Sequence, residues 1–138
     1  MSTDPLRALI AEDEAHARAN LREYLAEADF IQVIGEASDG RAALDFANRE
    51  RPTLIFLDVR MPEMSGLEVA RSLGYPAHLV FTTAYDKFAI AAFELGALDY
   101  LVKPFGRARF QETLRRLRAR VADSLTDTDR ARSADPRQ

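Results

Sequence analysis

Short apolar runs alternate with amphipathic segments five times along the chain. The apolar runs favour β-strands, which we expect at Leu6–Ala11, Ile31–Ala37, Thr53–Leu57, His78–Thr82 and Leu98–Val102. The third run is continuously apolar, which is typical of a central parallel strand covered on both faces. The second run mixes polar and apolar residues, as an edge strand does.

The segments between these runs carry apolar residues at helical spacing. We expect helices from about Glu14 to Ala28, through Ala43–Ala47, from Ser65 to Leu73, over Asp86–Leu95 and from about Arg107 to Val121. Five consecutive β-α units with short connections predict a parallel sheet with helices on both faces. The expected fold class is therefore α/β, a flavodoxin-like (βα)5 three-layer sandwich whose five-stranded parallel sheet has the order 2-1-3-4-5.

The composition fits one globular domain, because 47% of the 138 residues are hydrophobic and 30% are charged. The absence of cysteine excludes disulfides and thiol chemistry. The N-terminal residues are few and polar, and no apolar run approaches the roughly 18 residues of a membrane span. We therefore expect a cytoplasmic protein that does not contact the membrane. From Ala122 onward the sequence is polar and aperiodic, which predicts a domain of residues 1–122 and a flexible tail or truncated linker of residues 123–138.

The charge is distributed unevenly along the chain. Residues 1–106 carry ten Lys and Arg against seventeen Asp and Glu, a net charge of −7, whereas residues 107–138 carry nine Arg against five acids, a net charge of +4. The acidic globular part argues against nucleic-acid binding by this domain itself.

Polar residues follow four of the predicted strands at their carboxyl ends, where open α/β sheets bind ligands. They are Glu12 and Asp13 after the first strand, Asp58 after the third, Thr83 after the fourth and Lys103 after the fifth. In the expected order the first and third strands are neighbours, so the three carboxylates should converge. At a separation of roughly 5 Å and an effective dielectric of about 20, each pair repels by about 3 kcal/mol.

A hard divalent cation would relieve this repulsion, and a site with oxygen ligands alone suits Mg²⁺. Mg²⁺ held by carboxylates is also the usual partner of a transferred phosphoryl group. The Lys103 ammonium and the Thr83 hydroxyl suit phosphoryl oxygens, and a carboxylate can act as the phosphoryl acceptor. Taken singly, each of these residues has an ordinary structural role as a helix cap or turn residue. Their joint position at these strand ends predicts a phosphoryl-accepting site.

Four segments, LIAEDE, LIFLDVRMPEMSGLE, FTTAY and YLVKPF, closely resemble the receiver domain of bacterial response regulators. The resemblance extends from about Leu6 to Val121. It implies that Asp58 is the phosphoacceptor. It also implies that Asp13, Asp58 and the main-chain carbonyl of Arg60 ligate Mg²⁺, with Glu12 acting through a water.

The same resemblance assigns roles on the other side of the site. Thr83 and Lys103 would contact the phosphoryl group, and Tyr100 would be the aromatic switch residue that moves inward when Thr83 is recruited. The Lys103–Pro104 peptide bond would be cis, which the tertiary amide of proline makes inexpensive.

The resemblance further implies a function in two-component signalling. A sensor histidine kinase would phosphorylate the domain, which is a switch that assists its own phosphorylation and dephosphorylation and not otherwise an enzyme. Phosphorylation would change the surface of the fourth helix, fifth strand and fifth helix. Apart from the resemblance, this surface carries both acids and bases, namely Asp86, Glu94, Asp99, Lys87 and the arginines of the last helix. Opposite charges on one patch allow it to pair with its own copy, so we expect phosphorylation to promote a two-fold homodimer. The segment FTTAYDKFAIAAFELGALDYLVKPF resembles receivers that precede a LytTR-type DNA-binding domain, so transcription would be regulated through a DNA-binding domain absent from this chain. The alternative is a stand-alone receiver that signals by binding another protein.

Two other functions share parts of the pattern. A flavodoxin-type redox module has the same architecture, since fold does not fix function. Its phosphate loop should be neutral, whereas residues 12–14 are all acidic here. A phosphatase resembling the haloacid dehalogenases would carry a second acid two residues after its nucleophile, where this chain has Arg60. Both features favour the receiver.

Overall fold

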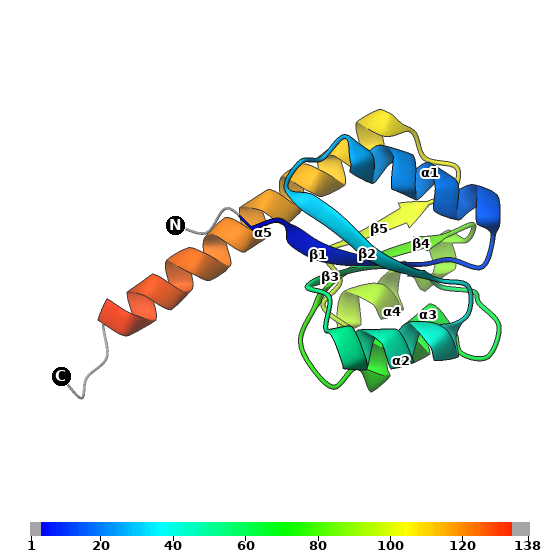
Figure 1. The fold of residues 1–138 in the computed structure, drawn as a ribbon, viewed down its shortest axis with the longest axis horizontal. Coiled ribbons are helices and arrows are strands. Elements are labelled where there is room, and N and C mark those ends of the chain that lie inside the picture. Colours follow the sequence, from blue (N-terminus) through cyan, green and yellow to red (C-terminus); the bar gives the residue numbers. More distant parts are fainter. Residues whose placement is uncertain (1–3, 134–138) are drawn as a thin grey trace.

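The sheet contains five parallel strands, as the sequence predicts. The computed structural model describes the backbone of residues 4–133 and the side chains of residues 4–123. The strands are β1 (Leu6–Ala11), β2 (Ile31–Ala37), β3 (Leu54–Asp58), β4 (His78–Thr83) and β5 (Asp99–Val102). Their order, β2-β1-β3-β4-β5 (Figure 1), confirms the expected flavodoxin-like topology.

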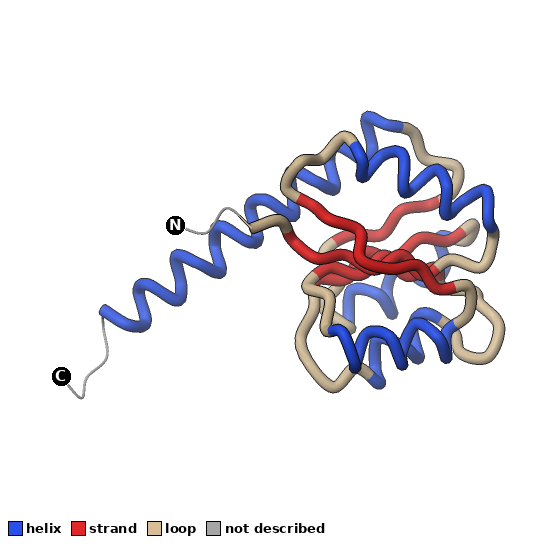
Figure 2. The backbone as a smooth tube through the Cα atoms, in the orientation of Figure 1, coloured by secondary structure: helices blue, strands red, loops and turns tan. Residues whose placement is uncertain are grey.

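Helices cover both faces of this sheet (Figure 2). They are α1 (Ala15–Ala26), α2 (Gly40–Glu50), α3 (Gly66–Ser72), α4 (Ala89–Glu94), which follows the 3₁₀ turn η1 (Asp86–Phe88), and α5 (Arg107–Ser133). Figure 1 shows α1 and α5 on one face and α2, α3 and α4 on the other. The described residues contain no helix that is long and apolar enough to cross a membrane.

Alternate residues of the strands point into two separate cores. On one side, Phe56 of β3 stacks on Phe110 of α5, with ring centroids 5.7 Å apart. On the other side, Leu57 and Phe81 belong to the core beneath α2, α3 and α4. Every residue of β3 is buried, as expected for a central strand covered on both faces.

Two helices differ most clearly from what the sequence predicts. The segment expected as one helix over Asp86–Leu95 begins with the turn η1, and short 3₁₀ turns of this kind are frequent at helix N-termini. The last helix, expected to end near Val121, continues to Ser133 and extends beyond the sheet (Figure 1). No Gly or Pro interrupts residues 122–133, so a helix anchored by its packed first half can propagate through them. Residues 134–138 of the predicted tail lie outside the described residues.

Candidate functional site

The candidate side chains lie at the carboxyl edge of the sheet. Glu12 directly follows β1, and its main-chain N–H donates to the carbonyl of Ala37 at 2.9 Å. Asp58 is the last residue of β3. Lys103 follows β5, and its main-chain N–H donates to the carbonyl of Thr83 at 2.7 Å. The Lys103–Pro104 bond is cis, as the resemblance implied.

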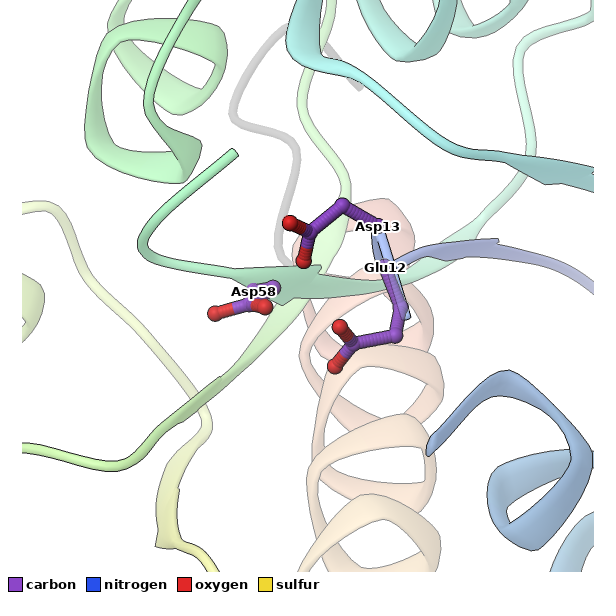
Figure 3. Close-up of side chains that lie close together, drawn as sticks. All are labelled: Glu12, Asp13 and Asp58. Carbon is purple, nitrogen blue, oxygen red and sulfur yellow. The ribbon is translucent and has the colours of Figure 1, made fainter. Parts of the chain in front are cut away.

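Three carboxylates from two neighbouring strands meet at this edge. Glu12, Asp13 and Asp58 each offer one oxygen, and these oxygens all lie within 4.8 Å of one another. Figure 3 shows the carboxylates of Asp13 and Glu12 extending from the end of β1 toward Asp58. Glu12 and Asp58 are buried, whereas Asp13 is exposed. A group made only of carboxylate oxygens, open to solvent on one side, fits a hard cation such as Mg²⁺.

One ammonium group contacts two of these acids. Lys103 Nζ lies 2.5 Å from Glu12 Oε1 and 3.2 Å from Asp58 Oδ2. The other oxygen of Glu12 accepts a hydrogen bond from the main-chain N–H of Glu14 at 3.1 Å. Glu12 is therefore well paired, while Asp58 has the longer ion pair and its second oxygen faces the loop that follows β3.

The electrostatics of the cluster differ from residue to residue. Burial, together with the neighbouring Glu12, raises the pKa of Asp58 to about 7. Burial also acts to raise the pKa of Glu12, but hydrogen bonds with Asp58 and Lys103 outweigh it and lower that pKa. Burial and the proximity of Glu12 raise the pKa of Asp13. Burial and the repulsion from Glu12 thus bring the pKa of Asp58 close to neutral pH, and a bound cation would offset both by favouring the charged carboxylate.

The loop between β3 and α3 is fixed against Asp58 by close backbone contacts. The Arg60 N–H donates to Asp58 Oδ1 at 3.2 Å, and the Gly66 N–H donates to the carbonyl of Val59 at 2.8 Å. A Cβ atom on Gly66 would lie 2.3 Å from the carbonyl oxygen of Asp58. Only glycine permits this approach, so the start of α3 packs directly on the backbone of Asp58.

On the β4 side of the site, the backbone of Tyr85 connects Thr83 with Tyr100. Its N–H donates to the Thr83 hydroxyl at 3.2 Å, and its carbonyl accepts a hydrogen bond from the Tyr100 hydroxyl. The Arg60 guanidinium lies over the Tyr85 ring, 4.6 Å from the ring centroid. The residues that the resemblance names as switch residues, Thr83 and Tyr100, therefore both contact the backbone of Tyr85.

Beside this site, the α4–β5–α5 face holds features that the sequence did not reveal. Asp99, expected among surface charges, is buried and 7% exposed. Its carboxylate accepts hydrogen bonds from Arg109 at 2.7 Å, Arg116 at 2.8 Å and Thr113 at 2.6 Å. The three donors are spaced by three or four residues on α5, and only that helical spacing hinted at a shared partner.

Comparison with known proteins agrees with this geometry. The family model described as the response regulator receiver domain matches residues 8–115. These residues include the last four strands, all but the first two residues of β1, and the candidate site residues.

Among curated proteins, the chain is similar to the transcriptional regulatory protein BtsR of Escherichia coli strain K12. The two are 45% identical over 116 residues, which cover 82% of this chain and 48% of that protein. A response regulatory protein of Vibrio cholerae is 44% identical over 114 residues, which cover 81% of this chain and 48% of that protein. The chain thus spans about half the length of the curated relatives it matches.

Solved structures share the fold. The REC domain of AraT, a response regulator from Geobacillus stearothermophilus, superposes with a TM-score of 0.79 at 33% identity, covering 87% of this chain and 98% of that domain. The response regulatory domain of the protein mrkE from Klebsiella pneumoniae gives a TM-score of 0.77 at 30% identity, covering 83% of this chain and 96% of that domain. With the matched family model, these similarities show that the chain belongs to the receiver domains of two-component response regulators.

Proposed function

We propose that the chain is a phosphoryl-accepting switch, phosphorylated on Asp58 by a sensor histidine kinase. The observation that carries this proposal is the position of the Asp58 carboxylate. It ends the central strand, lies among the three grouped acids, and is 3.2 Å from the Lys103 ammonium. Membership of the receiver family supports the same assignment.

In the proposed reaction, an Asp58 oxygen attacks the phosphorus of a phosphohistidine and forms an acyl phosphate. The phosphorus–nitrogen bond breaks, and the leaving imidazole nitrogen keeps the electron pair and takes up a proton. The Lys103 ammonium offsets the negative charge of the phosphoryl oxygens. The Thr83 hydroxyl, which accepts a hydrogen bond from Tyr85 at 3.2 Å, turns to donate to one of these oxygens.

The reaction requires the deprotonated form of Asp58, so the acid group needs a compensating cation. Asp13, Asp58 and the main-chain carbonyl of Arg60 would hold Mg²⁺, and Glu12 would act through a water. When bound, Mg²⁺ supplies positive charge to the carboxylates and the incoming phosphoryl group. The contact between the Arg60 N–H and Asp58 Oδ1 fixes the orientation of the acceptor carboxylate.

Acetyl phosphate with Mg²⁺ provides a direct test, because it needs no kinase. Intact-mass spectrometry should show one added phosphoryl group on the wild-type chain and none on Asp58→Asn. Asp45→Asn, which changes an exposed acid of α2, is the matched control and should be phosphorylated normally. Stoichiometric labelling of Asp58→Asn would refute the assignment.

The switch would then operate through Tyr85. When the Thr83 hydroxyl turns to the phosphoryl group, the Tyr85 N–H loses its acceptor and the backbone that holds the Tyr100 hydroxyl is released. Tyr100 then moves inward and changes the surface of β5. Tyr100→Phe should separate the two steps, since it removes the bond to Tyr85 but leaves phosphorylation of Asp58 intact.

The output surface is proposed to form a two-fold homodimer through α4, β5 and α5 after phosphorylation. The sequence favoured a contact made of opposite charges, but Asp99 is already paired within its own chain. Ile90 and Phe93 of α4 are instead 74% and 77% exposed. An apolar patch of this kind can pair with its own copy around a two-fold axis.

Sedimentation with and without a beryllofluoride phosphoryl mimic tests the dimer. The mimic should shift wild type toward dimer and should shift Phe93→Ser much less, with Glu94→Gln as a surface control. A wild-type protein that binds the mimic yet remains monomeric at high concentration would refute the dimer.

The proposed output is transcription, through a LytTR-type DNA-binding domain joined beyond α5. The support is similarity to a transcriptional regulatory protein of which this chain spans about half. An antibody against this domain, used on cell extracts, should detect a protein of about twice the chain's mass. A protein no larger than the chain would favour the stand-alone receiver.

A further inference from the structure

The turn that joins β1 to α1 carries two of the three grouped acids, yet it belongs to neither element. β1 ends at Ala11 and α1 begins at Ala15, which leaves residues 12–14 between them. Glu14 precedes the helix as its N-cap, but its side chain makes no capping hydrogen bond. A carboxylate that binds a cation works best when its backbone is held in place beforehand, so the contacts that fix this turn bear directly on the metal site.

One side chain of α1 reaches back to the turn. Arg18 Nη1 donates to the main-chain carbonyl of Glu12 at 2.8 Å. That carbonyl belongs to the planar peptide group between Glu12 and Asp13, so the guanidinium limits the rotation of the backbone from which the Asp13 side chain projects. The Glu12 N–H donates to the carbonyl of Ala37 at 2.9 Å. Glu12 is therefore held through both of its peptide groups.

Arg18 is itself oriented by an acid of β2. Its Nε lies 3.6 Å from Glu36 Oε1, and 21% of its side chain is exposed. Glu36 also accepts two hydrogen bonds from Arg22, at 2.7 and 2.8 Å. Contacts at both Nε and Nη1 restrict a long side chain that would otherwise sample many rotamers, so Arg18 forms a fixed link from β2 to the turn.

We propose that Arg18 is a positioning residue for the metal site, which sets the orientation of Asp13 through the carbonyl of Glu12. The role rests on the proposed function, in which Asp13 and Asp58 hold Mg²⁺. Groups that orient metal ligands without touching the metal commonly determine how tightly it binds.

Arg18 affects Mg²⁺ binding in two ways that have opposite signs. As a cation it repels Mg²⁺, so its charge alone would weaken binding. As a donor to the Glu12 carbonyl it holds Asp13 ready, which strengthens binding. The orienting effect should dominate, because the charge of Arg18 is offset by Glu36 and screened by solvent.

The opposite signs make a decisive variant possible. Arg18→Met keeps an unbranched side chain but removes both the donors and the charge. NMR titration of the unphosphorylated full chain with Mg²⁺, followed at the backbone amides of residues 12–14, should show binding about tenfold weaker than in wild type. Arg18→Lys, which keeps the charge and one donating group, should bind Mg²⁺ more tightly than Arg18→Met. Charge repulsion alone predicts the reverse order.

Arg22→Met is the matched control, because it removes the same charge from the same helix one turn further on, where Arg22 pairs with Glu36. Its Mg²⁺ affinity should stay within about twofold of wild type. A second measurement needs no metal. Hydrogen exchange of the Asp13 and Glu14 amides should be faster in Arg18→Met than in wild type and unchanged in Arg22→Met.

A Mg²⁺ affinity of Arg18→Met equal to or tighter than that of wild type would overturn the positioning role and leave the metal site standing. Unchanged exchange of the Asp13 and Glu14 amides in Arg18→Met would overturn it as well. An equal loss of affinity in Arg22→Met would do the same, since removal of any charge from the helix would then be sufficient. A wild-type chain whose amides do not respond to Mg²⁺ would overturn the proposed metal site and the role of Arg18 together.

Discussion

Replacing Asp58 by Asn should make the metal-free domain more stable. Asp58 is 5% exposed, and burial with the adjacent Glu12 raises its pKa from 3.8 to about 7. In the unfolded chain the same carboxyl ionises near its ordinary value. Folding above neutral pH therefore requires a buried, repelled carboxylate, whereas Asn is neutral and almost the same size.

The magnitude follows from the difference between the two pKa values. About three pH units, at about 1.4 kcal/mol each, set an upper bound of roughly 4 kcal/mol on the cost of ionised Asp58 at about pH 8. Asn also loses the ion pair to Lys103, which lies 3.2 Å from Asp58 Oδ2. We therefore expect Asp58→Asn to raise the free energy of unfolding by about 2 kcal/mol.

The upward direction of the Asp58 pKa shift makes the stability difference between wild type and Asp58→Asn depend on pH. Because the folded pKa of Asp58 is raised, the wild type loses stability as pH rises from about 4 to about 7, where the folded protein still holds a proton that the unfolded chain has released. The advantage of Asp58→Asn should grow over this range and then remain constant. Urea denaturation without Mg²⁺ at several pH values measures it, with Asp45→Asn as the exposed control. A variant that is less stable than wild type at about pH 8 would refute the reasoning.

Three further predictions test separate contacts. Asp13→Asn should fold but lose the rise in melting temperature that millimolar Mg²⁺ gives the wild type; a retained rise would count against this ligand. Arg60→Ala with Tyr85→Ala should lose the phosphoryl group faster in a mass-spectrometric time course, because the stacked pair shields the path of attacking water; an unchanged rate contradicts this. Asp99→Ala should lower the free energy of unfolding by about 2 kcal/mol in urea, since it removes the acceptor of three hydrogen bonds and leaves the buried Thr113 hydroxyl unpaired. Burial acts to raise the pKa of Asp99, but its hydrogen bonds, chiefly that from Arg109, outweigh burial and lower the pKa. The stabilisation that ionised Asp99 gives the wild type should therefore be lost as pH falls below about 4.

Much of the fold could be predicted because its determinants are local. The alternation of apolar runs and helical spacing gave the five strands within one or two residues at each end. The strand order was expected because 2-1-3-4-5 is a common order for five consecutive β-α units in a doubly wound sheet. The predicted end of α5 near Val121 was wrong, because polar composition does not stop a helix that is already anchored by Phe110, Leu114 and Leu117.

The cluster of Glu12, Asp13 and Asp58 could be predicted for a related reason. Its members end adjacent parallel strands, so topology alone brings them to one edge. Contacts made by packing could not be predicted in this way. Asp99 is buried only because α5 carries two guanidinium groups over β5, and nothing near Asp99 in the sequence shows them. The exposure of Phe93 was also hidden, because an apolar residue in a helix ordinarily predicts a buried face.

The close approach of Gly66 to Asp58 has a consequence for genetics. A side chain at Gly66 would collide with the carbonyl of Asp58, and one at Gly40 would come within 2.0 Å of the carbonyl of Met64. Neither glycine has a side chain that takes part in chemistry, yet each fixes the loop next to the acceptor. A random mutagenesis screen for signalling-defective alleles should therefore recover substitutions at these two positions as readily as at the carboxylates. Phenotype alone would not distinguish the residues that react from those that only leave room for them.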